Sequence, residues 1–244
     1  MDSFIHKEEM ISLKIPSKIG TRSYEYVSKI EFREKNIKSI FSRKIKIFHT
    51  GVVAGKHRFQ LLTLNFSEIG DQSESTSLLR KISYLFDNVV VSVDNSMRIE
   101  KVNNLNDLFN RWLYIKEEIS RTYKGFAVEN YFNTIDYLLK NPVRLIEFFH
   151  EYKMFGLFFN GFLNTFPIGR SIILEKSGIE LSAKKVNDDI ECVQLRTFFE
   201  NEKENVEGEF YYENSCLLDA TVNLSKENEK HKYQLLCFGL RKNP

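Results

Sequence analysis

The segment Gly51-Val52-Val53-Ala54-Gly55-Lys56 places two glycines ahead of a lysine, which is the composition of a phosphate-binding loop. The spacing between the glycines is one residue too short, and His57 stands where Ser or Thr would contact magnesium. The flanking residues are typical of strands, which favours a hairpin over a strand-to-helix turn. We therefore predict neither a nucleotide site nor any other cofactor here.

His49 and His57 flank the same turn and would face each other across a hairpin, as two ligands of a metal ion do. The other histidines, His6, His150 and His231, are remote in sequence, and no third ligand is apparent. We expect surface histidines and no metal.

Nucleophilic catalysis would need a cysteine beside a histidine base. Cys192, Cys216 and Cys237 are widely spaced, without a CxxC pair, and each lies in or beside a predicted strand among apolar residues. This pattern is typical of reduced, buried thiols.

Paired carboxylates do not indicate acid/base chemistry either, because Glu117-Glu118 and Asp188-Asp189 are adjacent and their side chains diverge. We predict no catalytic residues and favour a protein that is not an enzyme. The sequence leaves open the alternative of an enzyme whose catalytic residues are brought together only by the fold. A cleft holding His49 or His57 beside a carboxylate would indicate it.

Aromatic residues are concentrated between positions 148 and 166, around the small residues Gly156 and Gly161. One interpretation is a helix buried on most of its circumference. The other is that some rings line an apolar cavity or form an interaction surface. The candidate residues for such a pocket or surface are Phe148, Phe149, Tyr152, Phe155, Phe158, Phe159, Phe162 and Phe166, together with Trp112.

Charge is unevenly distributed although the net charge is only +2. Residues 1–60 hold 13 Lys/Arg against 6 Asp/Glu, and residues 177–230 hold 6 against 13. We expect these side chains to lie on solvated sheet faces of opposite sign. Basic residues alternate with aromatic ones near Lys44, Lys46 and Phe48, but the balanced total charge disfavours nucleic-acid binding.

Apolar periodicity predicts strands, then helices, then strands. The first part has strand-like runs at 45–48, 58–66, 89–93 and 97–102, and a short helix over 76–87. Helices follow, with Asn104 and Asn141 as caps, and the helical block extends to residue 166. Six further strands follow, separated by turns and by a polar loop over 200–208. The expected segments are 171–174, 179–183, 190–199, 209–212, 216–224 and 232–238.

This order predicts an α+β fold in which a curved antiparallel sheet is formed by two β regions, with a helical block inserted between them. We expect a single domain over 1–244, since no linker separates the β regions. Its parts are a β-rich segment with one short helix (1–103), the helical block (104–166) and a second β-rich segment (167–244).

The strand pair from Val89 to Asn104 and the helix from Leu105 to Ile119, with Trp112, resemble a block in uncharacterised proteins, mainly of the Bacteroidetes. Those proteins are thought to form curved half-barrels like lipoprotein carriers. The resemblance covers about 35 residues, and Ser96 stands where such hairpins often have Gly. It implies a cytosolic relative, linked to a secretion or toxin system, and transfers no functional residue.

These patterns predict a non-enzymatic protein that acts through a protein partner, in an immunity, adaptor or chaperone-like role. The alternative is a carrier of an apolar small molecule in a half-barrel pocket. The first nine residues contain no basic segment followed by an apolar run, so we expect no secretory signal and a cytoplasmic location. The most apolar stretch, 154–166, is too short to span a bilayer.

Overall fold

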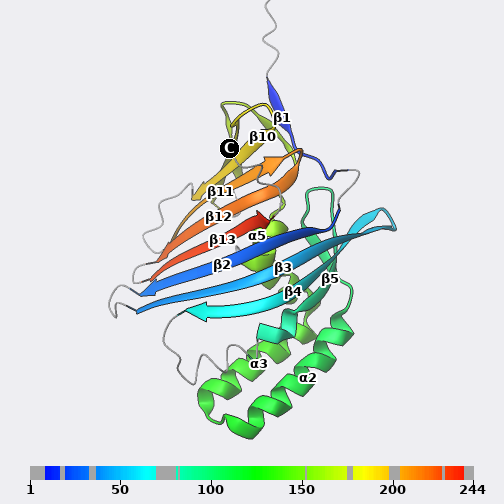
Figure 1. Cartoon of the computed structure of the whole chain (residues 1–244), viewed down its shortest axis with the longest axis vertical. Coiled ribbons are helices and arrows are strands. Elements are labelled where there is room, and N and C mark those ends of the chain that lie inside the picture. The colour runs from blue at the N-terminus through cyan, green and yellow to red at the C-terminus, as the bar shows by residue number, and fades with distance from the viewer. Residues whose placement is uncertain are drawn as a thin grey trace, which may run out of the picture.

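Two groups of strands, one from each part of the sequence, form a single 11-stranded antiparallel sheet in the computed structural model of the protein (Figure 1). The structure describes residues 9–16, 20–32, 37–69, 81, 83–151, 153–174, 178–197, 204–226 and 229–238. The sheet is open and curved, and its strand order is β6-β5-β4-β3-β2-β13-β12-β11-β10-β9-β8. The strands are β2 (Arg22–Phe32), β3 (Ile37–Val53), β4 (Lys56–Ile69), β5 (Asn88–Val93), β6 (Ile99–Val102), β8 (Ser171–Leu174), β9 (Ile179–Lys185), β10 (Ile190–Thr197), β11 (Glu204–Glu213), β12 (Cys216–Lys226) and β13 (Glu229–Phe238).

The two β regions meet at the pairing of β2 with β13, where Phe32 lies opposite Glu229 and Tyr24 opposite Cys237. β6 and β8 are the outer strands of the sheet. The chain between them contains the helices and therefore connects one edge of the sheet to the other. A small second sheet pairs β1 (Met10–Ser12) with β7 (Thr165–Pro167). The predicted α+β fold, a curved antiparallel sheet with an inserted helical block, is confirmed.

Alternation of apolar and polar residues gives the sheet one buried and one solvated face. On the buried face, Leu195, Gly208 and Val222 lie directly opposite one another on β10, β11 and β12. A Cβ on Gly208 would lie 2.8 Å from Leu195 Cδ2 and 3.0 Å from Val222 Cγ2, so this glycine makes room for its two neighbours. The opposite face is polar along these strands and the neighbouring β9. Its residues include Ser182, Gln194, Glu209 and Thr221.

The helices are α2 (Leu105–Thr122), α3 (Phe126–Lys140), α4 (Pro142–His150) and the short α5 (Met154–Phe158), with a 3₁₀ turn, η1 (Tyr84–Phe86), ahead of β5. In Figure 1, α5 lies behind the centre of the sheet, while α2 and α3 lie beyond β4. Among the described residues, the last helix ends at Phe158, and Thr165–Pro167 is a strand, so the described helices stop before the expected boundary at 166. Half of the helix expected over 76–87 falls outside the described residues, and η1 occupies part of the other half.

The two predicted helix caps have different outcomes. Asn141 accepts a hydrogen bond from the Arg144 backbone N–H, and Pro142 opens α4, as the sequence indicates. Asn104 occupies the N-cap position of α2, as predicted, but its side chain forms no cap bond. Instead it accepts from Val90 N (2.8 Å) and donates to Asn88 O (3.0 Å), which ties the start of α2 to β5.

The residues from Gly51 to Lys56 form the β3–β4 hairpin, as the sequence predicts. Ala54 and Gly55 occupy its two-residue turn with φ of 51° and 76°, which matches a type I′ turn. Gly51, at φ 119°, follows a register shift between β3 and β4. A helix does not follow this turn, so the backbone differs from that of a phosphate-binding loop. In the part of the chain that the structure describes, helices long and apolar enough to cross a bilayer are absent.

Candidate functional site

A cavity of about 510 Å³ lies between the curved sheet and the helices. This volume falls in the range of about 300–1,000 Å³ that is typical of small-molecule pockets. The wall combines three adjacent strands with residues near η1 and from α3, α4 and α5. The lining residues are Tyr26, Ser28, Ile30, Ser39, Phe41, Arg43, Phe66, Ser83, Phe86, Tyr131, Phe148, Phe149, Lys153, Met154 and Phe155.

The strand side of the cavity follows from alternation along β2 and β3. Every second residue points to the same face, so Ser39, Phe41 and Arg43 of β3 reach the cavity while Lys44 is exposed. Arg43 lies directly opposite Tyr26 on β2, and Phe66 lies opposite Arg43 on β4. A row of three side chains thus crosses the cavity floor.

The helix side is a group of packed aromatic rings. Phe149 contacts Phe155 with ring centroids 4.5 Å apart and Phe86 at 5.2 Å in an edge-to-face arrangement. Phe148 lies 5.9 Å from Phe86 and is half-buried. Edge-to-face and offset contacts of this kind stabilise aromatic clusters beyond the area they bury. The rings therefore form a closely packed apolar wall.

Two cations interrupt this apolar lining. Arg43 donates through Nη1 to the Ser83 carbonyl oxygen at 3.3 Å, and its guanidinium lies 5.2 Å from the centre of the Phe66 ring. Burial lowers the pKa of Arg43 from its ordinary value, with Asp87 opposing that effect. Lys153 lies 5.7 Å from the Phe148 ring and forms an ion pair with Glu151.

Two tyrosines lie near Arg43. Burial raises the pKa of Tyr26 above its ordinary value and that of Tyr131 to about 12, and the charge of Arg43 acts in the opposite direction on both. Both phenols are therefore protonated at neutral pH, and their hydroxyls can donate hydrogen bonds. The cavity thus presents a cation and hydroxyl donors within an apolar wall.

A second, much smaller cavity of about 30 Å³ lies beside Tyr24, Phe158 and Cys216, with Arg22 in its wall. This volume holds about one water molecule. Arg22 Nη1 is buried there and has no hydrogen-bond partner among the described residues. The site has room for a solvent molecule but not for an organic ligand.

The aromatic residues proposed from the sequence divide into two groups. Phe148, Phe149 and Phe155 line the large cavity, and the last two are also buried. Phe162 packs on Phe210 at 4.8 Å. Tyr152 lies outside the described residues. The four proposed residues that pack in the core between 158 and 166 are Phe158, Phe159, Phe162 and Phe166.

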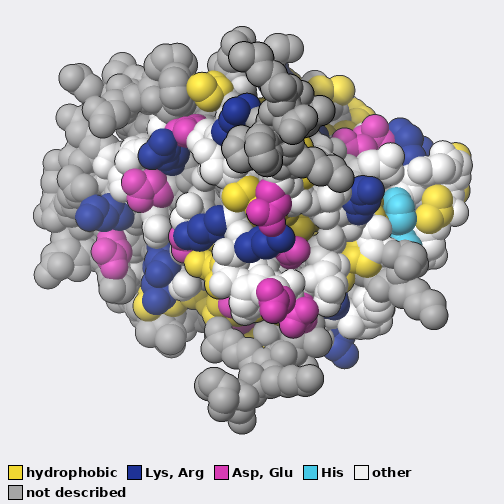
Figure 2. Space-filling model, turned by 90° about the horizontal axis from the view of Figure 1, so that it is seen from above, with side chains coloured by type: hydrophobic (Ala, Val, Ile, Leu, Met, Phe, Trp, Pro, Cys, Tyr) yellow, Lys and Arg dark blue, Asp and Glu magenta, His cyan; other side chains and the backbone are white. Residues whose placement is uncertain are grey.

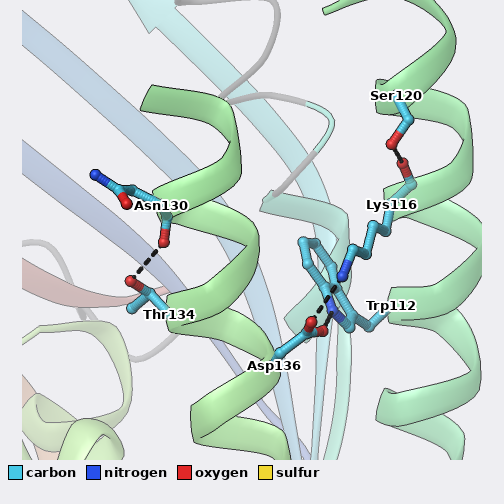
Figure 3. Close-up of polar contacts among 6 residues, drawn as sticks. All are labelled: Trp112, Lys116, Ser120, Asn130, Thr134 and Asp136. Atoms are coloured by element: carbon cyan, nitrogen blue, oxygen red, sulfur yellow. Dashed lines mark hydrogen bonds and ion pairs between the residues drawn. The ribbon is translucent and has the colours of Figure 1, made fainter. Parts of the chain in front are cut away.

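Trp112, also proposed as a pocket residue, is fully buried between α2 and α3 (Figure 3). Its Nε1 donates to Asp136 Oδ1 at 2.6 Å, and Lys116 Nζ lies 2.6 Å from Asp136 Oδ2. The Phe132 ring meets the indole edge-to-face at 5.6 Å. Hydrogen bonds and the neighbouring cation lower the pKa of Asp136 although its partial burial opposes this. These contacts join two helices, which is a structural role.

His49 and His57 do face each other across the β3–β4 hairpin, with Nε2 and Nδ1 3.1 Å apart. The His49 ring also lies 5.0 Å from that of Phe59. Burial, and secondarily His57, lower the pKa of His49. Across the described residues, groups of three or more potential metal ligands are absent, and neither ring forms a hydrogen bond with a carboxylate.

The cysteines are separated from these histidines. Cys192 and Cys216 are buried, and Cys237 is half-buried. Burial raises the pKa of all three thiols, which disfavours the reactive thiolate.

Basic and acidic side chains are interspersed on the face seen from above in Figure 2. On the solvated side of the sheet, for example, Arg196 of β10 forms an ion pair with Glu180 of β9. In this view, side chains of both signs lie next to one another.

The sequence matches none of the known protein-family models and none of the curated proteins. Among solved structures, one described as "Lipid-protein interactions in lipovitellin" has a similar arrangement, with a TM-score of 0.47 and 9% sequence identity. The similarity covers 92% of this chain and 25% of that one, so the chain spans about a quarter of the length of its structural neighbour. A likeness at this level supports no statement about activity or ligand.

Proposed function

We propose that the protein binds an apolar small molecule in the large cavity between the sheet and the helices. The observation that carries this proposal is the cavity itself, about 510 Å³ in volume and lined mainly by aromatic and aliphatic side chains. Transfer of an apolar molecule from water into such a space is favourable by about 25 cal/mol for each Å² of apolar surface removed from water. The packed rings of Phe149 and Phe155 keep the wall in place before a ligand arrives.

A neutral fluorescent dye that brightens in apolar surroundings, Nile red, tests the proposal directly. We expect saturable binding to the purified protein. Replacing Ser39 by Phe (S39F) places a large ring in the cavity and should weaken binding at least about tenfold, equivalent to about 1.4 kcal/mol.

Ser42 provides the matched control, because it lies three residues along the same strand on the solvated side of the sheet and contacts Ser67. S42F makes the same chemical change outside the cavity and should leave the dye affinity within about threefold. Absence of saturable binding, or equal affinity of the wild type and S39F, would contradict the proposal. Native mass spectrometry of gently purified protein then shows whether a small molecule is already bound.

A protein partner, in the immunity, adaptor or chaperone-like role expected from the sequence, is the second candidate. The observation that favours it is the exposure of large apolar side chains on the helices. Tyr114 of α2, Phe126 of α3 and Val143 of α4 are 68%, 78% and 65% exposed. A second polypeptide of fixed stoichiometry in the native mass spectrum, lost when Phe126 is replaced by Ser, would support this role. A native mass spectrum of the gently purified protein that contains only the monomer would count against this role.

A further inference from the structure

The large cavity has an asymmetric charge. Its lining includes two cations, Arg43 and Lys153, while no carboxylate is present among the described lining residues. The positive charge of Lys153 is already balanced by its ion pair with Glu151. Arg43 is therefore the lining residue whose charge calls for a partner.

Arg43 has few partners for its five N–H donors. One hydrogen bond, to the Ser83 carbonyl oxygen, joins it to the rest of the described chain, and one face of the guanidinium covers Phe66. Asp87 influences Arg43 electrostatically, but the two form no ion pair within 4.0 Å, and Asp87 also lies under the influence of Arg111. A half-buried guanidinium without a carboxylate in contact is costly unless another anion compensates it.

Neighbouring groups would complete a site for such an anion. Tyr26 lies directly opposite Arg43 in the sheet, and Tyr131 approaches from α3. Both side chains line the same cavity. A guanidinium with one or two phenolic hydroxyls can donate several charge-assisted hydrogen bonds to one carboxylate or phosphate. The rest of the wall, with Phe148, Phe149 and Phe155, accepts a hydrocarbon chain.

We infer that the cavity binds an amphipathic molecule with a single anionic headgroup, a carboxylate or a phosphate, whose headgroup contacts Arg43 and whose alkyl chain lies along the aromatic wall. This inference rests on the proposed function, since it assigns a class of ligand to the same cavity. Arg43 provides selectivity, whereas the aromatic wall provides affinity for any apolar chain.

The test compares three ligands with the same alkyl chain: dodecanoic acid, dodecyl phosphate and dodecanol. Each competes with Nile red for the full-length protein at neutral pH. We expect the wild type to prefer at least one of the two anions over the alcohol by about 10- to 100-fold, as expected for hydrogen bonds to a charged group. In R43M, which keeps an unbranched side chain without charge, that preference should fall below about threefold while dodecanol affinity changes little.

K44M is the matched control, because Lys44 is the next residue on β3 and is exposed on the opposite side of the sheet. This variant loses the same formal charge as R43M and should keep the preference for the anions over dodecanol. R43K, which keeps the charge without the forked donors, should keep part of it. Urea unfolding of each variant, followed by Trp112 fluorescence, establishes that the variants compared are folded.

Three outcomes would overturn the inference. Equal affinity of the wild type for the anions and the alcohol would show that the headgroup is not recognised, although an apolar ligand binds. An undiminished preference in folded R43M would show that Arg43 is not the anchor. Absence of competition by all three ligands and of Nile red binding would refute the proposed function, and the inference with it.

Discussion

Gly156 of α5 lies close to the backbone at the end of α4. Its replacement by Ala (G156A) has two opposing effects on stability, a steric clash and a gain in helix propensity. An ideal Cβ at this position would lie 1.9 Å from the Glu151 carbonyl oxygen and 2.7 Å from that of His150. Ordinary van der Waals contact begins at 3.4 Å, so the backbone of one segment must move by about 1.5 Å. Because the obstructing atoms belong to the backbone, rotation of a side chain cannot relieve the contact.

Helix propensity alone predicts the opposite sign. Ala is favoured over Gly within a helix by about 1 kcal/mol. Overpacking costs about 1–3 kcal/mol and more where the backbone must shift. We therefore expect G156A to lower the free energy of unfolding by about 2 kcal/mol, which corresponds to a fall in Tm of about 4–8 °C for a chain of this size.

Urea unfolding monitored by Trp112 fluorescence measures this change, since the chain contains a single tryptophan. Gly20 is the control, because its φ lies outside the left-handed region and a Cβ added there would meet open space. G20A should be neutral or stabilising by up to about 1 kcal/mol. Since Met154 and Phe155 line the cavity beside Gly156, G156A should also weaken Nile red binding. A G156A protein as stable as the wild type would refute the reasoning.

Two further predictions concern buried polar groups. D136A leaves the buried indole N–H of Trp112 without its acceptor and should lower the free energy of unfolding, measured in urea, by about 1–3 kcal/mol. D136N keeps an acceptor and should lower it by less. Equal losses in the two variants would contradict this prediction. Burial, and secondarily the charge of Arg98, lower the pKa of His150. The unfolded state therefore binds more protons than the folded state as the pH falls. The free energy of unfolding should decrease as the pH drops below about 6.5. H150F should reduce that fall, measured by urea unfolding between about pH 8 and pH 5, and an unchanged pH dependence would contradict the assignment.

Much of the sheet was predictable because its strands alternate between a buried and a solvated face. The expected strands at 171–174, 179–183 and 216–224 fall within β8, β9 and β12. The loop expected over 200–208 is wrong in its second half, because β11 begins at Glu204. Glu207 lies on the solvated face, and the contacts of Gly208 with Leu195 and Val222 leave no room for a side chain there. The polar, glycine-containing composition therefore indicates a turn, although the backbone is extended.

The cavity was only partly predictable. The aromatic concentration identified Phe148, Phe149 and Phe155, but the same signal included rings that pack in the core. Arg43 was missed because it belongs to a basic stretch with Lys44. Its side of the sheet could have been predicted, because alternation along the strand places Arg43 on the same face as the apolar residues Phe41 and Ile45. Its proximity to Tyr131 depends on where α3 lies relative to the sheet, and local sequence patterns do not determine this position.

The pairing of β2 with β13 has a consequence for the order in which the sheet can be completed during synthesis. Phe32 lies opposite Glu229, so the central strands are joined by contacts between residues that are far apart in sequence. Until β13 has left the ribosome, β2 has an unpaired edge, and unpaired edges promote association with other chains. Contacts of such large sequence separation also slow folding. The middle of the sheet is therefore the last part to close, and the nascent chain would need protection there until its final described strand is made.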